Sequence, residues 1–197
     1  VEQIELCQSF RDRGYLISAE RNGITPEGFD FDNSPFSYQD PKVKGSKICV
    51  TTTNGTVAIR RSAEAPKVYV GAFLNLSSIT EAVKKWQGDA LVVCAGWKGK
   101  PNLEDTLFAG AVVNVLRKDF VHFDDACVAA EDMYLLAKDD LRGYLKKSSH
   151  NHRLEQLNIE EDVKFCLKVD MCQAIPVLEG ERLIPLAPKG GISEVQI

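Results

Sequence analysis

Short apolar runs alternate with helical patterns between residues 47 and 117, and this alternation allows few architectures. The predicted order is strand 47–52, helix 56–62, strand 67–71, helix 78–86, strand 90–94 and helix 103–117. Strands that alternate with helices form parallel βαβ units, and near-continuous apolar strands are buried on both faces. We therefore predict an α/β fold, a three-layer α/β/α arrangement with a largely parallel or mixed sheet and a helical C-terminal part.

The flanking segments extend this prediction. An amphipathic helix with Ile4, Leu6, Cys7 and Phe10 opens the chain, and a short strand follows at 15–19. Residues 24–45 hold glycine, proline, aspartate and aromatic residues without a period. Such a stretch predicts a long ordered loop, which usually has a functional reason.

The chain beyond Phe120 is predicted to be mostly helical. Helices are expected at 124–138, at 139–147 and from Asn158 onward, and edge strands at 174–178 and 182–186, where Pro176 and Pro185 fit an unpaired edge. A capping box, Ser78-x-x-Glu81, predicts the start of the helix at 78–86. We expect one domain over 1–187 and a flexible tail at 188–197.

Composition excludes several classes of protein. The 197 residues are 44% hydrophobic and 26% charged, as in an ordinary globular domain. A net charge of -4, with no cationic cluster beyond Lys98 and Lys100, argues against a nucleic-acid surface. No apolar run approaches the roughly 18 residues of a membrane span. The six scattered cysteines lack C-x-x-C spacing, which predicts reduced core residues and a cytoplasmic protein.

The loop after strand 47–52 carries the most specific chemistry. It reads Thr51-Thr52-Thr53-Asn54-Gly55-Thr56 and runs into a helix. Hydroxyls, an amide and the first N–H groups of a helix converge there, which is an arrangement that binds phosphate and similar anions. The same letters also describe a β-branched strand end followed by a turn and an N-cap. Both interpretations stay open on the pattern alone.

Two further loops offer charged side chains at strand ends. Gly96 follows strand 90–94, and Glu104 and Asp105 follow at a helix start, where paired carboxylates next to a phosphate can hold Mg²⁺. Helix capping produces the same acidic pattern. Glu20 and Arg21 follow the first strand, and an arginine there can pair with a phosphate or sulfonate, although a surface ion pair explains it equally well.

Three other motifs carry reactive side chains. Cys94 ends a strand, but Lys100 stands where a C-x5-R phosphatase needs arginine, and a buried thiol is a poor nucleophile. Asp30-Phe31-Asp32 lies in a loop rather than at the end of a buried strand, which argues against an aspartyl nucleophile. His150 and His152 suit a solvated linker, while general-acid use of His150 stays open.

Taken together, the segments resemble the 2-phosphosulfolactate phosphatases, the Mg²⁺-dependent hydrolases of the coenzyme M pathway. The block Thr51–Thr56 is the most specific match. The other matching segments are Glu20 to Gly23, Gly28 to Pro35, Cys94 to Gly96 with Glu104-Asp105 and Ala109-Gly110, and Ser149-His150 with Glu161 to Val163. They span most of the chain in the family's order.

This resemblance implies hydrolysis of a phosphate monoester of a small sulfonated or carboxylated acid, giving 3-sulfolactate and phosphate in the named reaction. Thr52, Thr53, Asn54, Gly55 and Thr56, with Gly96, would hold the phosphate or the acid group. Glu104 and Asp105, with Glu20, would hold or orient Mg²⁺, and Arg21 would pair with the sulfonate or carboxylate.

The resemblance also exposes a departure. Family members begin with a further strand and an Asp-x-x-Arg-Ala-Thr-Thr-type loop, which this chain lacks, so part of the active site is expected outside it. A non-catalytic anion-binding module and a phosphatase of a different small phosphorylated acid remain the alternatives. The expected partner is the small substrate, with neither nucleic acid nor membrane, and unpaired sheet edges would permit a homodimer.

Overall fold

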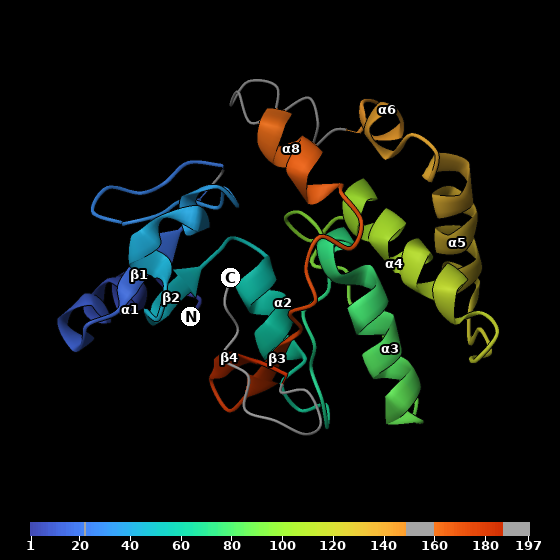
Figure 1. Ribbon diagram of the computed structural model, residues 1–197, viewed down its shortest axis with the longest axis horizontal. Coiled ribbons are helices and arrows are strands. Elements are labelled where there is room, and N and C mark those ends of the chain that lie inside the picture. Colours follow the sequence, from blue (N-terminus) through green and yellow to red (C-terminus); the bar gives the residue numbers. More distant parts are fainter. Residues whose placement is uncertain (22, 149–159, 187–197) are drawn as a thin grey trace.

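The computed structural model describes residues 1–21, 23–148 and 160–186, which mix helices with short strands (Figure 1). The helices are α1 (Ile4–Ser9), α2 (Gly55–Arg61), α3 (Leu76–Trp86), α4 (Leu103–Leu116), α5 (Asp125–Ala137), α6 (Leu141–Leu145) and α8 (Glu160–Cys166). The strands are β1 (Leu16–Ala19), β2 (Ile48–Thr51), β3 (Pro176–Glu179) and β4 (Arg182–Pro185). Short 3₁₀ helices lie at η1 (Arg11–Arg13), η2 (Ser37–Gln39), η3 (Pro41–Val43) and η4 (Phe73–Asn75).

The strands form two separate pairs. β1 and β2 are parallel, with Leu16 opposite Ile48 and Ala19 opposite Thr51. β3 and β4 form an antiparallel hairpin. In Figure 1, α1, β1 and β2 lie together on one side and α3, α4 and α5 on the other. The mixture of helix and strand agrees with the predicted α/β class, but these two small sheets do not confirm a three-layer arrangement.

Two of the predicted strands are wrong. Residues 67–71 contribute only a bridge from Tyr69 to Val177, and residues 90–94 form no strand. The side chain of Leu91 is 87% exposed, although its apolar run predicted burial on both faces. A strand needs a neighbouring backbone to satisfy its N–H and C=O groups, and nothing in the described residues pairs with 90–94.

Most predicted helices are confirmed within a few residues, but one capping prediction is wrong. α3 begins at Leu76, so Ser78 lies inside the helix and caps nothing. The buried Asn75 side chain instead accepts a hydrogen bond from the Ala72 N–H and donates to the carbonyl of Ala174, 2.9 Å away in both cases. This tertiary contact to the segment before β3 has no local signature.

Several predictions cannot be compared with the structure. The start of the last helix at Asn158, the pair His150 and His152, and the tail at 188–197 all lie outside the described residues.

The predicted hairpin of edge strands near the C-terminus is confirmed by β3 and β4. No helix in the described ranges has both the length and the apolar character needed to cross a membrane.

The first part of the chain packs around a small core of Cys7, Ile17 and Cys49. The Cys7 thiol donates to the Cys49 carbonyl, 3.2 Å away, and burial raises the pKa of Cys7 to about 12. All six cysteines are free, as predicted, but Cys94, Cys166 and Cys172 are exposed rather than core residues.

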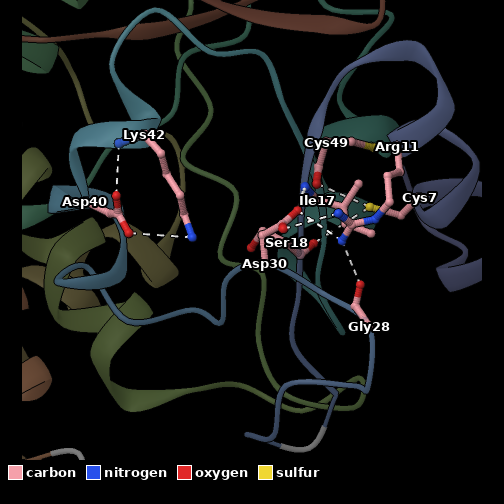
Figure 2. Close-up of polar contacts among 9 residues, drawn as sticks. All are labelled: Cys7, Arg11, Ile17, Ser18, Gly28, Asp30, Asp40, Lys42 and Cys49. Carbon is pink, nitrogen blue, oxygen red and sulfur yellow. Dashed lines mark hydrogen bonds and ion pairs between the residues drawn. The ribbon is translucent and has the colours of Figure 1, made fainter.

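The loop 24–45 is fastened to this core through Asp30 (Figure 2). The Asp30 carboxylate accepts from the Ile17 N–H at 2.9 Å and pairs with the Arg11 guanidinium at 3.2 Å. Arg11 also donates to the Gly28 carbonyl at 2.8 Å. These contacts give Asp30 a structural use, and the prediction that the Asp30-Phe31-Asp32 motif carries no nucleophile stays a prediction.

The larger core lies between α3, α4, α5 and α6, with Phe73, Leu107, Ala111, Leu116 and Ala137 buried at its centre. α4 and α5 cross closely because position 110 has no side chain. A Cβ atom on Gly110 would lie 1.9 Å from the carbonyl oxygen of Ala130. Only glycine therefore fits this crossing without moving a helix backbone.

Gly110→Ala tests this crossing. Alanine is the better helix former by about 1 kcal/mol, so intrinsic propensity alone predicts stabilisation. The clash with Ala130 should outweigh that gain and lower the free energy of unfolding by roughly 1–3 kcal/mol in a urea titration. Val115→Ala, at a partly exposed site on the same helix, is the control and should cost less than about 1 kcal/mol. Equal or greater stability of Gly110→Ala would contradict the close crossing.

Candidate active site

The parallel register of β1 and β2 brings two predicted site segments to the same sheet edge. Because Ala19 lies opposite Thr51, Glu20 and Thr52 leave the carboxyl ends of the two strands side by side. The Glu20 Oε2 atom accepts from the Thr53 hydroxyl at 3.1 Å and lies 3.4 Å from the Thr53 N–H. Its Oε1 atom accepts from the Gly23 N–H at 2.5 Å. The Glu20 carboxylate thus links the loop that follows β1 to the loop that follows β2.

The turn Thr52–Thr56 is organised mainly by its own threonines. The Thr52 hydroxyl accepts from the Thr56 N–H at 3.1 Å, and the Thr56 hydroxyl donates to the Thr52 carbonyl at 3.1 Å. These bonds cap the start of α2, as the turn-and-cap interpretation predicts. The N–H groups of Asn54 and Gly55 donate to no acceptor within the described ranges. The turn therefore combines helix capping with two backbone donors that are available to an anion.

The loop before α4 joins this turn. The Asn54 Oδ1 atom accepts from the Lys98 N–H at 3.2 Å. Trp97 and Lys100 exchange two backbone hydrogen bonds, Trp97 N–H to Lys100 carbonyl at 2.9 Å and the reverse at 3.0 Å, which closes a tight hairpin around Lys98 and Gly99. The Gly96 N–H donates to the Asp105 Oδ2 atom at 2.7 Å. Gly96 and Asp105, predicted separately, are thus in direct contact.

The predicted acidic pair lies in the first turn of α4. The Glu104 carboxylate accepts from the side-chain amide of Asn102, so one of its oxygens already has a partner beside the helix start. No group of three His, Cys, Asp or Glu side chains able to hold a metal occurs in the described ranges. The available donors are oxygens, the kind that Mg²⁺ prefers, and Mg²⁺ commonly completes its six ligands with water and substrate phosphate. The donor chemistry therefore fits Mg²⁺ with few protein ligands.

Arg21 is held by oxygens of its own chain. Its Nη1 atom donates to the Glu20 carbonyl at 2.7 Å. Its Nη2 atom donates to the Glu2 carbonyl at 2.8 Å and to the Thr51 hydroxyl at 2.7 Å. The guanidinium therefore ties the start of the chain to the end of β2, and its predicted pairing with a substrate acid group stays a prediction.

Cys94 lies near this cluster but is exposed and outside any strand, so its predicted packing in a strand is wrong. Partial desolvation by its neighbours and the charge of Asp105 raise the pKa of the Cys94 thiol. A raised pKa lowers the thiolate fraction at neutral pH, and only the thiolate is a good nucleophile. This agrees with the prediction that Cys94 is not the nucleophile.

An open hollow of about 510 Å³ lies elsewhere, lined by residues of the loop 30–42 that include Asp40 and Lys42. Asp40 caps η3 through the Lys42 N–H at 2.9 Å and pairs with the Lys42 ammonium at 3.5 Å (Figure 2). None of the predicted site residues lines this hollow. The predicted site residues lie in the polar loops at the β1–β2 edge and in the loop before α4, away from the residues that line this hollow.

Three loops thus form one connected cluster, which we name the loop cluster. It consists of residues 20, 21 and 23, residues 52–56, and residues 96–105. Hydrogen bonds run from Glu20 to Thr53, from Asn54 to Lys98 and from Gly96 to Asp105. Every predicted site residue lies in or next to it. The sequence did not predict the contact of Lys98 with Asn54, because Lys98 was considered only as one of the cations too few to form a nucleic-acid surface.

Comparison with known proteins identifies the family of the chain. A family model described as 2-phosphosulpholactate phosphatase matches residues 1–181. A probable 2-phosphosulfolactate phosphatase of Caldanaerobacter subterraneus subsp. tengcongensis is 41% identical over 180 residues, 90% of this chain and 74% of the relative. One from Thermotoga petrophila is 42% identical over 179 residues, 90% of this chain and 77% of the relative. One from Clostridium acetobutylicum is 32% identical over 163 residues, 82% of this chain and 69% of the relative.

These matches confirm the predicted enzyme class, a phosphoric monoester hydrolase. They cover all three loops of the loop cluster, since the family model extends from the first residue to residue 181. The chain therefore belongs to the 2-phosphosulpholactate phosphatase family.

Proposed function

We propose that this protein hydrolyses, with Mg²⁺, the phosphate monoester of a small sulfonated or carboxylated acid, as in the conversion of 2-phosphosulfolactate to 3-sulfolactate and phosphate. Family membership supports the reaction class. The observation that carries the proposal for this chain is the hydrogen-bonded path from the Thr52–Thr56 turn to Asp105. It joins a phosphate-type donor turn to a carboxylate through one short hairpin.

The turn is the proposed phosphate site. The N–H groups of Asn54 and Gly55 can donate to phosphoryl oxygens, and the absence of a Cβ at Gly55 allows close approach of the backbone. Glu20 positions the turn through Thr53 rather than contacting phosphate, because two anions would repel each other. Donors fixed before the substrate arrives need no rearrangement as negative charge develops in the transition state.

Asp105 is the proposed principal protein ligand of Mg²⁺, with Glu104 and Glu20 as further carboxylates of the same cluster. Its Oδ2 atom is held by the Gly96 N–H, which fixes the orientation of the carboxylate. Bound Mg²⁺ would supply polarisation of the phosphoryl oxygens.

In the reaction, the oxygen of a water forms the new bond to phosphorus, the ester P–O bond breaks, and the leaving alkoxide takes a proton. His150, for which a general-acid role stays open, lies outside the described residues.

One observation favours a second candidate, a non-catalytic module that only binds anions. The hydroxyls of Thr52 and Thr56 are bonded within the turn, so their arrangement serves helix capping whether or not chemistry occurs. Such a module would bind phosphate and phosphorylated acids without releasing phosphate from them. Turnover therefore separates the two candidates, whereas affinity does not.

Asp105→Asn tests the proposed role of the carboxylate. The amide keeps an oxygen that can accept from the Gly96 N–H, so the loop should persist while the charge is lost. We expect kcat/KM for phosphate release from 2-phosphosulfolactate and 2-phospholactate to fall at least about 100-fold, since metal and oxyanion contacts contribute on that scale. Asn54→Ala, which cuts the bond to Lys98, should raise KM by roughly tenfold.

The control for Asp105→Asn is Asp132→Asn, the same chemical change at an exposed position of α5. Phosphate release by this control should stay within about twofold of wild type. If the full-length wild-type protein binds the phosphorylated acids yet releases no phosphate, the binding-module candidate is correct. If Asp105→Asn retains full activity, the carboxylate does not serve the reaction.

Removal of the divalent cation provides an independent test. After dialysis against a chelator, we expect phosphate release from 2-phospholactate to fall by roughly 100-fold or more, because no other described group replaces the Lewis acid. Added Mg²⁺ should restore it, whereas Ca²⁺ should restore less, because it forms longer and less regular contacts. Full activity in the metal-free protein would refute the Mg²⁺ dependence while leaving the phosphatase assignment in place.

A further inference from the structure

A substrate of the proposed kind carries two anions, a phosphate ester and a carboxylate or sulfonate. In a small acid they lie only a few bonds apart, so their protein partners must lie close together. The Thr52–Thr56 turn offers donors to one of them. The partner of the second anion should therefore come from a loop that touches this turn directly.

Arg21 is poorly placed for that role. Three of its hydrogen bonds go to the Glu20 carbonyl, the Glu2 carbonyl and the Thr51 hydroxyl. Turning the guanidinium toward a ligand would break contacts that hold the start of the chain against β2. An arginine that must first give up such bonds recovers little net affinity from a new ion pair.

Lys98 lies in the loop that does touch the turn. Its N–H donates to the Asn54 side chain at 3.2 Å, which places its backbone beside the unpaired N–H groups of Asn54 and Gly55. Its side chain is exposed, and it forms no ion pair with any carboxylate in the described ranges. The ammonium lies 5.4 Å from the centre of the Trp97 ring. A flexible four-carbon stem lets it move from that ring to a ligand at the turn.

The backbone of Lys98 is held in an unfavourable conformation. Its φ is 50°, in the left-handed region, and that of Gly99 is 74°. Glycine adopts this region freely, but for lysine it costs about 1 kcal/mol or more. Backbone strain of this kind is retained mostly where a binding site requires it. Here it occurs at the tip of the hairpin closed by Trp97 and Lys100, where Lys98 is exposed.

We propose that Lys98 is the specificity-determining residue that binds the carboxylate or sulfonate of the substrate while the Thr52–Thr56 turn binds the phosphate. This inference rests on the proposed function. It makes the site selective for phosphate esters of small acids over phosphate esters that lack an acid group. Lys100, on the same hairpin, forms no hydrogen bond with the turn among the described residues, and we assign it no part in binding the acid group.

The test compares 2-phospholactate with isopropyl phosphate, in which a methyl group replaces the carboxylate. The quantity measured is the ratio of their kcat/KM values. Lys98→Gln should lower this ratio at least about tenfold, chiefly by raising KM for 2-phospholactate, because a charge-assisted contact is lost from binding. Lys98→Arg, which keeps the charge, should restore the ratio to within about threefold of wild type.

The matched control is Lys100→Gln, which removes the same charge two residues away. It should change the ratio by less than about threefold, since exposed charges at a distance are screened by salt. Equal losses in Lys98→Gln and Lys100→Gln, or a ratio unchanged by Lys98→Gln, would overturn the assignment of Lys98 while the proposed function stands. If the wild-type protein releases phosphate from none of the three esters (2-phospholactate, isopropyl phosphate and 2-phosphosulfolactate), the proposed function fails and this inference fails with it.

Discussion

The parallel pairing of β1 with β2 is the constraint on which the rest of the site depends. Its register sets Ala19 opposite Thr51, so both strands end at one edge and the loops that follow them must meet. The meeting is fixed by the Glu20 carboxylate, which accepts from the Thr53 hydroxyl. A slip of one residue would turn every side chain of the strand to the opposite face and separate these loops. The small core of Cys7, Ile17 and Cys49 maintains this register.

From this edge the site extends to the helical part of the protein through the side chain of Asn54. Asn54 accepts from the Lys98 N–H, and the same hairpin is bonded to Asp105 at the start of α4. α4 in turn is positioned by its close crossing with α5 at Gly110. Packing in the helical core thus determines where the Asp105 carboxylate lies relative to the Thr52–Thr56 turn. Substitutions far from the loops can therefore alter activity by displacing α4.

The helices and the three loops could be predicted because their signals are local. Apolar periodicity predicts α3, α4 and α5, and the Thr51–Thr56 block predicts a strand end followed by a turn. The strand at 90–94 could not be predicted correctly in this way, because strand formation depends on a partner backbone that an apolar run does not specify. The capping box predicted at Ser78 was wrong because α3 begins earlier, at Leu76. The residue before it, Asn75, is buried and bonded to the distant Ala174 carbonyl, a contact that the local sequence does not specify.

The site residues could likewise be predicted one by one from local signals, whereas the contacts between them could not. The contact of Gly96 with Asp105 and the contact of Glu20 with Thr53 join residues predicted individually, yet the pairs themselves follow only from the fold. Lys98 was missed because its significance comes from a positive φ and a contact with Asn54, neither of which a count of charges contains.

The central claim is that the turn at the β1–β2 edge binds phosphate through the N–H groups of Asn54 and Gly55. A titration of ¹⁵N-labelled protein with inorganic phosphate, the reaction product, tests it most directly by following the amide resonances. The account predicts saturable shifts at Asn54 and Gly55, with a smaller shift at Lys98, because its N–H is bonded to the Asn54 side chain. Saturable shifts confined to other parts of the chain, with Asn54 and Gly55 unchanged, would contradict it.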